Sequence, residues 1–122
     1  SHIRCANDQR FSPIFIDDVA NALIEIIDKS LTGVFHMGGP RSVSRLEMLN
    51  CIISACGEYE KIDTKVHPCS IKSFSFEEPR PSDVALVSDK LQGQLVTRFR
   101  NIEEMCAEFA LQWHRRKKCS EG

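Results

Sequence analysis

The stretch Arg80-Pro-Ser-Asp-Val-Ala-Leu-Val-Ser-Asp-Lys-Leu91 decides the fold when it is taken together with two stretches that precede it. These are Asn7-Asp-Gln-Arg-Phe-Ser-Pro-Ile-Phe-Ile-Asp-Asp-Val-Ala20 and Gly33-Val-Phe-His-Met-Gly-Gly39. In each of them a proline or glycine that favours a turn adjoins a short apolar run, and a helical pattern follows. Short strands that alternate with helices in this way predict an α/β fold.

Apolar spacing predicts a first main helix that begins near Val19 and ends near Asp28. Either Asp17 or Asp18 is expected to cap its N-terminus. Its apolar residues recur with the spacing of an amphipathic helix: Val19, Ala20, Leu23, Ile24 and Ile27.

Capping signals predict the start of two more main helices. The capping box Ser44-x-x-Glu47 starts a helix for which Gly57 is well placed as the C′ residue. The pattern Asn101-x-x-Glu104 starts the last helix, which is expected to end near Arg116. A short helix over residues 88–91, capped by Ser88, completes the set.

The remaining segments predict short strands and one long loop. Residues 10–16 read as an extended loop or edge strand, because Pro13 cannot donate to a ladder. Residues 34–37 are expected to form a buried strand in which His36 is a core histidine. A third strand covers residues 62–67 and ends at Pro68. Residues 69–81 form a surface loop of a length that often carries function.

Size and charge narrow the class of protein. The 122 residues suffice for one domain, expected over residues 1–118 with a C-terminal tail over 119–122. A net charge of -1 gives no reason to expect a nucleic acid or a membrane as partner. No apolar run reaches the ~18 residues of a membrane span, and no secretion signal is visible.

Six cysteines indicate a reducing, cytoplasmic setting, because a chain that can bury a core does not need disulfides. A zinc site is the sharper alternative. It would use Cys51 and Cys56 with His67 and Cys69, although their spacing is not that of a paired structural site.

The residues do not provide for nicotinamide chemistry. Gly38-Gly39-Pro40 lacks the three spaced glycines of a dinucleotide fingerprint and indicates a tight turn. The only tyrosine, Tyr59, is followed four positions later by Asp63, so a Tyr-x-x-x-Lys pair is missing. We therefore expect no catalytic residue and no cofactor site in this segment.

The ordered stretches resemble the C-terminal, substrate-side part of the dTDP-4-dehydrorhamnose reductase family, which belongs to the extended short-chain dehydrogenase/reductases. The regulatory beta subunit of methionine adenosyltransferase is similarly close. The matching positions are Asp8-Gln9, Pro13, Asp18-Val-Ala20, Gly33-Val-Phe-His36, Glu47-Met48 and the stretch from Arg80 to Leu91. Two positions depart from the family pattern: Ile14 replaces a threonine, and Asp83 replaces an asparagine beside the expected anion site.

The resemblance implies a C-terminal substrate-binding subdomain with short strands and three main helices, whose Rossmann half lies outside these residues. It implies NAD(P)H for a full-length protein and substrate contacts in this segment from Arg80, with Gln9, Arg10 and Pro13 beside it. Arg80 is expected to hold a diphosphate, because a guanidinium donates two parallel hydrogen bonds. A surface salt bridge to Glu77 or Glu78 is the alternative role for Arg80.

Three functions are compatible with these features. The first is the substrate-binding portion of a nucleotide-sugar reductase, not catalytic by itself. The second is a regulatory subunit like that of methionine adenosyltransferase, and the third is a short binding module. The partner would be the chain's own Rossmann half or another subunit, and a homodimer is possible. If a larger partner is missing, an apolar patch should be exposed, or hidden in a dimer or a swapped assembly.

Overall fold

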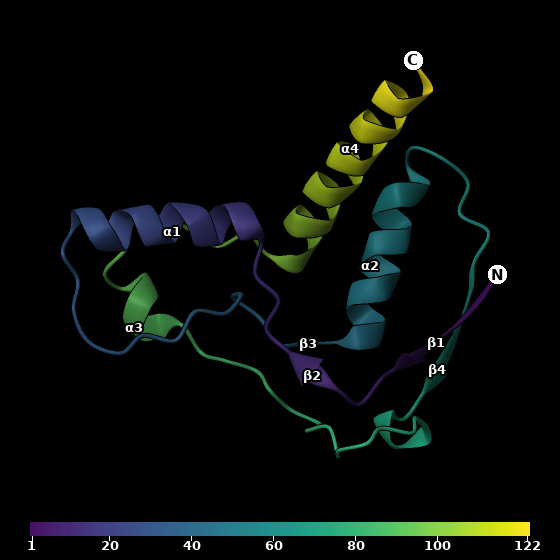
Figure 1. The fold of residues 1–122 in the computed structure, drawn as a ribbon, viewed down its shortest axis with the longest axis horizontal. Helices are drawn as coiled ribbons and strands as arrows, with labels where there is room; N and C mark the ends of the chain where they lie inside the picture. Colours follow the sequence, from purple (N-terminus) through teal and green to yellow (C-terminus); the bar gives the residue numbers. More distant parts are fainter.

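The computed structural model describes all residues 1–122 and has the predicted α/β character (Figure 1). In chain order its elements are β1 (His2–Ala6), β2 (Arg10–Phe11), α1 (Ile16–Asp28), β3 (Val43–Ser44), α2 (Arg45–Gly57), β4 (Lys65–Cys69), the 3-10 helix η1 (Ile71–Ser73), α3 (Asp89–Gln92) and α4 (Ile102–Glu121). None of the helices is both long and apolar enough to cross a membrane.

Two small sheets connect distant parts of the chain. β1 and β4 are parallel, with a register that runs from His2 opposite Lys65 to Ala6 opposite Cys69. β2 and β3 are antiparallel and pair two residues each. Pro68 lies inside β4 and not after it, as had been predicted. A two-stranded sheet tolerates this proline because the outer edge of each strand is unpaired and needs no backbone N–H donor.

The prediction of a strand over residues 34–37 was wrong, because no neighbouring strand is available to pair with it. A side chain satisfies part of its backbone instead: the Lys90 Nζ donates to the carbonyl of Val34 at 3.0 Å. The expectation of a buried His36 was wrong for the same reason, because the segment runs along the surface and this side chain is exposed.

Both predicted capping boxes are confirmed. Ser44 Oγ accepts from the amide of Glu47 at 3.1 Å, and Glu47 Oε2 accepts from the amide of Ser44 at 2.5 Å. Asn101 and Glu104 make the same reciprocal pair at the start of α4. α4 continues past the predicted end at Arg116 to Glu121, and α2 includes Gly57 as its last residue, with Glu58 as the C-cap.

The start of α1 differs from the prediction. Its N-cap is Phe15, which offers no capping side chain, and both aspartates lie in the first helical turn. Asp18 is buried because its carboxylate reaches Arg100 across the molecule. Capping was therefore the wrong role for Asp18.

α1 also leaves its apolar stripe in solvent, although such a stripe ordinarily faces a core. The inward face carries Asp18 and Ala22, the two buried residues of the helix. The exposed fractions on the other side are large: Ile16 76%, Leu23 49%, Ile24 59% and Ile27 74%. α1 therefore exposes an apolar face whose burial against another surface would be favourable.

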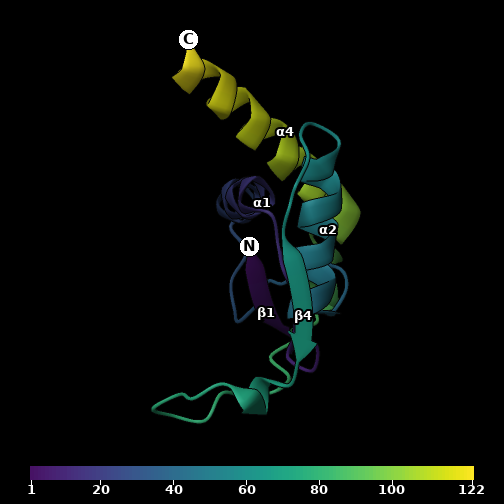
Figure 2. The same ribbon diagram turned by 90° about the vertical axis from the view of Figure 1, so that its right-hand side faces the viewer.

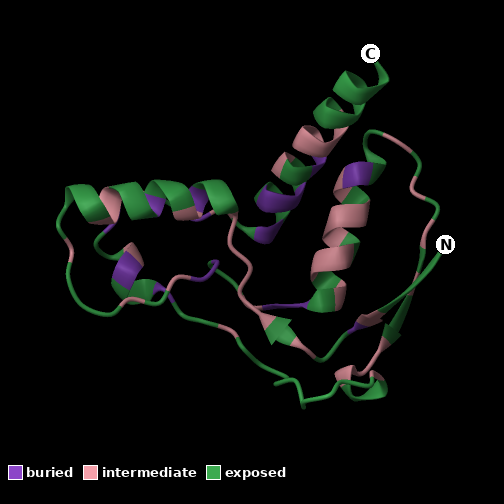
Figure 3. Ribbon diagram, in the orientation of Figure 1, coloured by how far each residue is buried: buried purple, intermediate pink, exposed green.

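Two separate clusters form the core, one where α1 meets α3 and the other where α2 meets α4 (Figure 3). In the first, α1 and α3 pack through Ala22, Leu91, Leu95 and Phe99. In the second, α2 and α4 pack around Val43, Ile102, Met105 and Cys106. Only 16 of 122 residues are buried, so these clusters leave much apolar surface uncovered.

Candidate substrate-binding site

The carboxyl ends of β1 and β4 lie at one edge of their parallel sheet, and the loops that follow them form the candidate site. Ligands of open α/β sheets bind outside such strand ends. The residues after β4 project from the rest of the molecule at this edge (Figure 2). Asp8 joins the two loops, because its carboxylate accepts from Ser70 Oγ at 2.6 Å and from the amide of Ile71 at 2.7 Å. These two hydrogen bonds lower the pKa of Asp8.

Gln9 occupies the junction between three segments. Its Nε2 donates to the carbonyl of Pro81 at 3.2 Å, and its Oε1 accepts from Arg45 Nε at 3.3 Å. Its own carbonyl accepts from the amide of Arg45 at 3.1 Å. The structure therefore brings Gln9 next to the stretch that begins at Arg80.

Arg10 lies beside the same stretch through its backbone, since its amide donates to the Ser82 carbonyl at 2.7 Å. Its guanidinium turns the other way. Nε and Nη2 donate to the side chain and the carbonyl of Ser42 at 3.0 and 2.8 Å, and Nη1 lies 3.7 Å from Glu47. In this structure Arg10 holds the chain before α2 in place.

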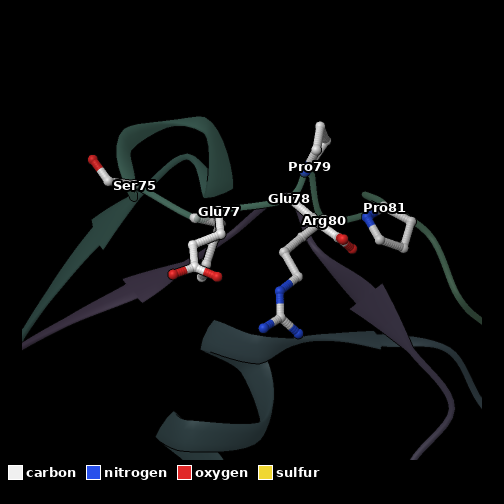
Figure 4. Close-up of a pocket in the computed structure, with 7 residues that line it drawn as sticks. Ser75, Glu77, Glu78, Pro79, Arg80 and Pro81 are labelled. Atoms are coloured by element: carbon white, nitrogen blue, oxygen red, sulfur yellow. The ribbon is translucent and has the colours of Figure 1, made fainter.

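Arg80 lies in a loop that encloses a hollow of about 640 Å³, lined by residues 75–81 (Figure 4). Its Cζ is 5.1 Å from the ring centre of Phe76, a cation–π contact. The alternative of a salt bridge to Glu77 or Glu78 is not what the structure shows, because Arg80 forms no ion pair. Its N–H groups remain free to bind a ligand.

Pro13 does not join this group. It lines a different, apolar cavity of about 200 Å³ between the start of α1 and the helices α2 and α4. Pro13 and Gly39 are in close approach: a Cβ built on Gly39 would lie 1.7 Å from the Pro13 carbonyl oxygen. Only glycine fits there.

Ser12 and Ser88 fix the walls of a further cavity of about 360 Å³, and neither was predicted for this role. Ser12 Oγ accepts from the Leu86 amide at 3.0 Å and donates to the Leu86 carbonyl at 3.1 Å. Ser88 Oγ does the same for Gly38, at 2.7 and 2.9 Å. Ser88 occupies the N-cap position of α3, as predicted, but its hydroxyl makes no cap there.

Asp83 behaves as the family asparagine could. Its Oδ1 accepts from the Ala85 amide at 2.9 Å, a local turn that asparagine and aspartate both form. The substitution therefore preserves the backbone of the stretch after Arg80.

The glycine pair offers no phosphate cradle, since both amides are already used. Gly38 donates to Ser88, and Gly39 donates to the Ser12 carbonyl at 3.1 Å. The residues present therefore do not fit a nicotinamide dinucleotide. No three His, Cys, Asp or Glu side chains are grouped to hold a metal, and all six cysteines are free thiols. Burial raises the pKa of Cys5 and Cys56, and raises that of Cys106 to about 12, which makes these thiols poor nucleophiles.

Fold and site together define a class: the substrate-binding part of an extended short-chain dehydrogenase/reductase fold. Residues 1–114 match the family described as the RmlD substrate binding domain. The chain belongs to this family, which is one of nucleotide-sugar reductase-like proteins. No curated protein sequence matches the chain.

Solved structures of dTDP-4-dehydrorhamnose reductases share the fold. The Bacillus anthracis enzyme in complex with NADP has a TM-score of 0.77 and 23% identity over 92% of this chain and 38% of its own. The Clostridium acetobutylicum enzyme has a TM-score of 0.74 and 26% identity over 88% of this chain and 37% of its own. The Yersinia enterocolitica enzyme has a TM-score of 0.76 and 18% identity over 89% and 37%. The chain thus spans less than two fifths of the length of these reductases.

Proposed function

We propose that this chain is the substrate-binding part of an NAD(P)H-dependent reductase that acts on a nucleotide sugar. The observation that carries this proposal is the hydrogen bond from Gln9 to the carbonyl of Pro81, the residue after Arg80, beyond the carboxyl ends of β1 and β4. It occurs in a chain that belongs to the RmlD substrate binding domain family. By itself the chain would bind and position the substrate. Hydride and proton transfer would need a nucleotide-binding half, because the amides of Gly38 and Gly39 are not available to a dinucleotide.

The exposed stripe on α1 supports a missing partner. A contiguous apolar helix face of this kind marks an interaction surface. We assign it to the nucleotide-binding half of the same protein, since the solved reductases are more than twice as long as this chain. Replacement of Ile24 by aspartate would then weaken the association of the two halves when they are produced as separate chains, whereas Asn21→Asp on the same helix would not. Equal association of both variants would contradict this assignment.

Calorimetric titration of the full-length protein with dTDP- and UDP-sugars tests the function. We expect measurable heat with at least one of them, and NADPH oxidation when a 4-keto sugar nucleotide is supplied. The absence of heat with every nucleotide sugar would refute the proposal. Binding without turnover would instead favour the alternative of a non-catalytic regulatory subunit, like the beta subunit of methionine adenosyltransferase.

A further inference from the structure

The parallel sheet of β1 and β4 carries a pair of histidines on one exposed face. His2 lies opposite Lys65, and His67 lies two residues further along β4, opposite Arg4. Side chains two apart on a strand share a face, so all four of these residues lie on the same side of the sheet. All four are exposed. Neither histidine belongs to the candidate substrate-binding site, which lies beyond the carboxyl ends of both strands.

The two imidazole rings each direct a nitrogen atom toward the other. His2 Nδ1 lies 2.9 Å from His67 Nε2, the ring centres are 5.2 Å apart, and the ring planes differ by 17°. A neutral imidazole has one N–H donor and one bare acceptor nitrogen, so a single proton lies between these two atoms. When the donor ring carries its proton on its other nitrogen instead, two lone pairs converge on one point between the strands.

A metal ion that binds imidazole can take the place of this proton. Bonds from Zn²⁺ to histidine nitrogen are about 2.0–2.1 Å long, so two of them at a tetrahedral angle hold the nitrogen atoms roughly 3.3 Å apart. The observed separation of 2.9 Å would have to open by only about 0.4 Å. Exposed side chains can make this adjustment, and water would occupy the remaining coordination positions.

The surroundings indicate which ions fit. Neither strand contains a carboxylate, and no third metal-binding side chain joins the pair. Mg²⁺ and Ca²⁺ require several oxygen ligands, whereas imidazole suits Zn²⁺, Cu²⁺ and Ni²⁺. Arg4 is committed elsewhere, because its Nη2 donates to Ser73 Oγ at 2.8 Å and its Cζ lies 4.9 Å from the ring centre of Phe74. The charge of Lys65 opposes any cation, which favours an ion held by strong imidazole bonds over one held by charge alone.

We propose that His2 and His67 bind a divalent transition-metal ion that links β1 to β4. This site goes beyond the proposed function, because it needs neither a nucleotide sugar nor a cofactor. The ion would stabilise the two strands from which the loops of the candidate substrate-binding site emerge. It would also give His67 a different partner from the one considered in the sequence, since Cys51 and Cys56 lie in α2 and are not grouped with it.

Calorimetric titration of the full-length protein with Ni²⁺ tests the pair, because Ni²⁺ favours imidazole whereas thiolates also bind Zn²⁺. We expect His2→Ala and His67→Ala each to weaken Ni²⁺ binding by about 10-fold or more, since each removes one of two protein ligands. His36→Ala is the matched control, because His36 is exposed and lies outside both sheets. Its Ni²⁺ affinity should equal that of the unmodified protein. Cys69→Ser, at the end of β4, should also leave the affinity unchanged.

A chemical measurement on the unmodified protein separates binding from folding. Diethyl pyrocarbonate modifies free imidazole nitrogen, and mass spectrometry of the peptides locates the modified histidines. Ni²⁺ should protect His2 and His67 from the reagent and leave His36 modified. Equal modification of His67 with and without Ni²⁺, or a Ni²⁺ affinity that is unchanged in His67→Ala, would overturn the inference. A loss of Ni²⁺ binding in Cys69→Ser with none in the histidine variants would assign the ion to the thiol and would also overturn it.

Discussion

Replacement of Asp18 by asparagine should remove the main polar link between α1 and the segment before α4. The Asp18 side chain is only 6% exposed, and its two oxygens accept from the amide and the Nη1 of Arg100, both at 2.8 Å. Asparagine can still accept from the amide, but its NH₂ group would face the guanidinium donor. The change therefore leaves a cation without its counter-ion at a partly buried position.

The magnitude follows from two charge-assisted hydrogen bonds, each worth about 1.5–3 kcal/mol. Breaking a fully buried ion pair costs about 3–5 kcal/mol, but the Arg100 side chain is 35% exposed and water can solvate it. We therefore expect Asp18→Asn to lower the free energy of unfolding by about 2–4 kcal/mol. With a urea m-value of about 2 kcal/mol/M, the midpoint should fall by about 1–2 M.

Urea denaturation followed by circular dichroism measures this change, and Asp17→Asn is the control. Asp17 is exposed and forms no ion pair, so its variant should stay within about 0.5 kcal/mol of the unmodified chain. A double-mutant cycle with Arg100→Met would show whether the two losses share one interaction. If Asp18→Asn and Asp17→Asn unfold at the same urea concentration, Asp18 does not hold the two parts together.

Two further predictions concern Glu25 and a pair of glycines. Hydrogen bonds from Lys29, and from Val96 and Thr97, lower the pKa of Glu25 to about 2. The ionised Glu25 therefore stabilises the folded state fully above its ordinary pKa of about 4.3, and this stabilisation is lost as the pH falls toward 2. Glu25→Gln should therefore flatten the fall of the urea midpoint between these pH values, and an unchanged pH profile would contradict the role of this carboxylate. Gly39→Ala should lower the free energy of unfolding by about 3 kcal/mol or more, because the added Cβ would overlap the Pro13 carbonyl. Gly57→Ala is the control and should be neutral or stabilising, since open space surrounds Gly57. Equal melting temperatures of the two variants would refute the close approach.

The sequence allowed good predictions where structure depends on neighbouring residues. The capping box of Ser44 and Glu47 and that of Asn101 and Glu104 involve residues three apart, and both are present. The family resemblance rested on the order of whole stretches and was confirmed over residues 1–114.

Contacts between distant residues escaped prediction. β1 was not predicted, and its partner strand β4 lies more than 60 residues away in the chain. The stripe on α1 was recognised, but periodicity shows which side of a helix is apolar and not what covers it. The contact of Arg45 with Gln9 was missed for a related reason, because the two residues belong to different parts of the chain.

The hydroxyls of Ser12 and Ser88 have a consequence for the order of folding. Each one links segments that lie 74 or 50 residues apart, and the Asp18–Arg100 pair spans 82. Contacts of such long range are expected to form late, because closing the long loop between them costs conformational entropy. The α2 capping box needs no such closure and can form early. We therefore expect the residues after Arg80 to reach their places late in folding, so that the candidate site is completed only when both core clusters already exist.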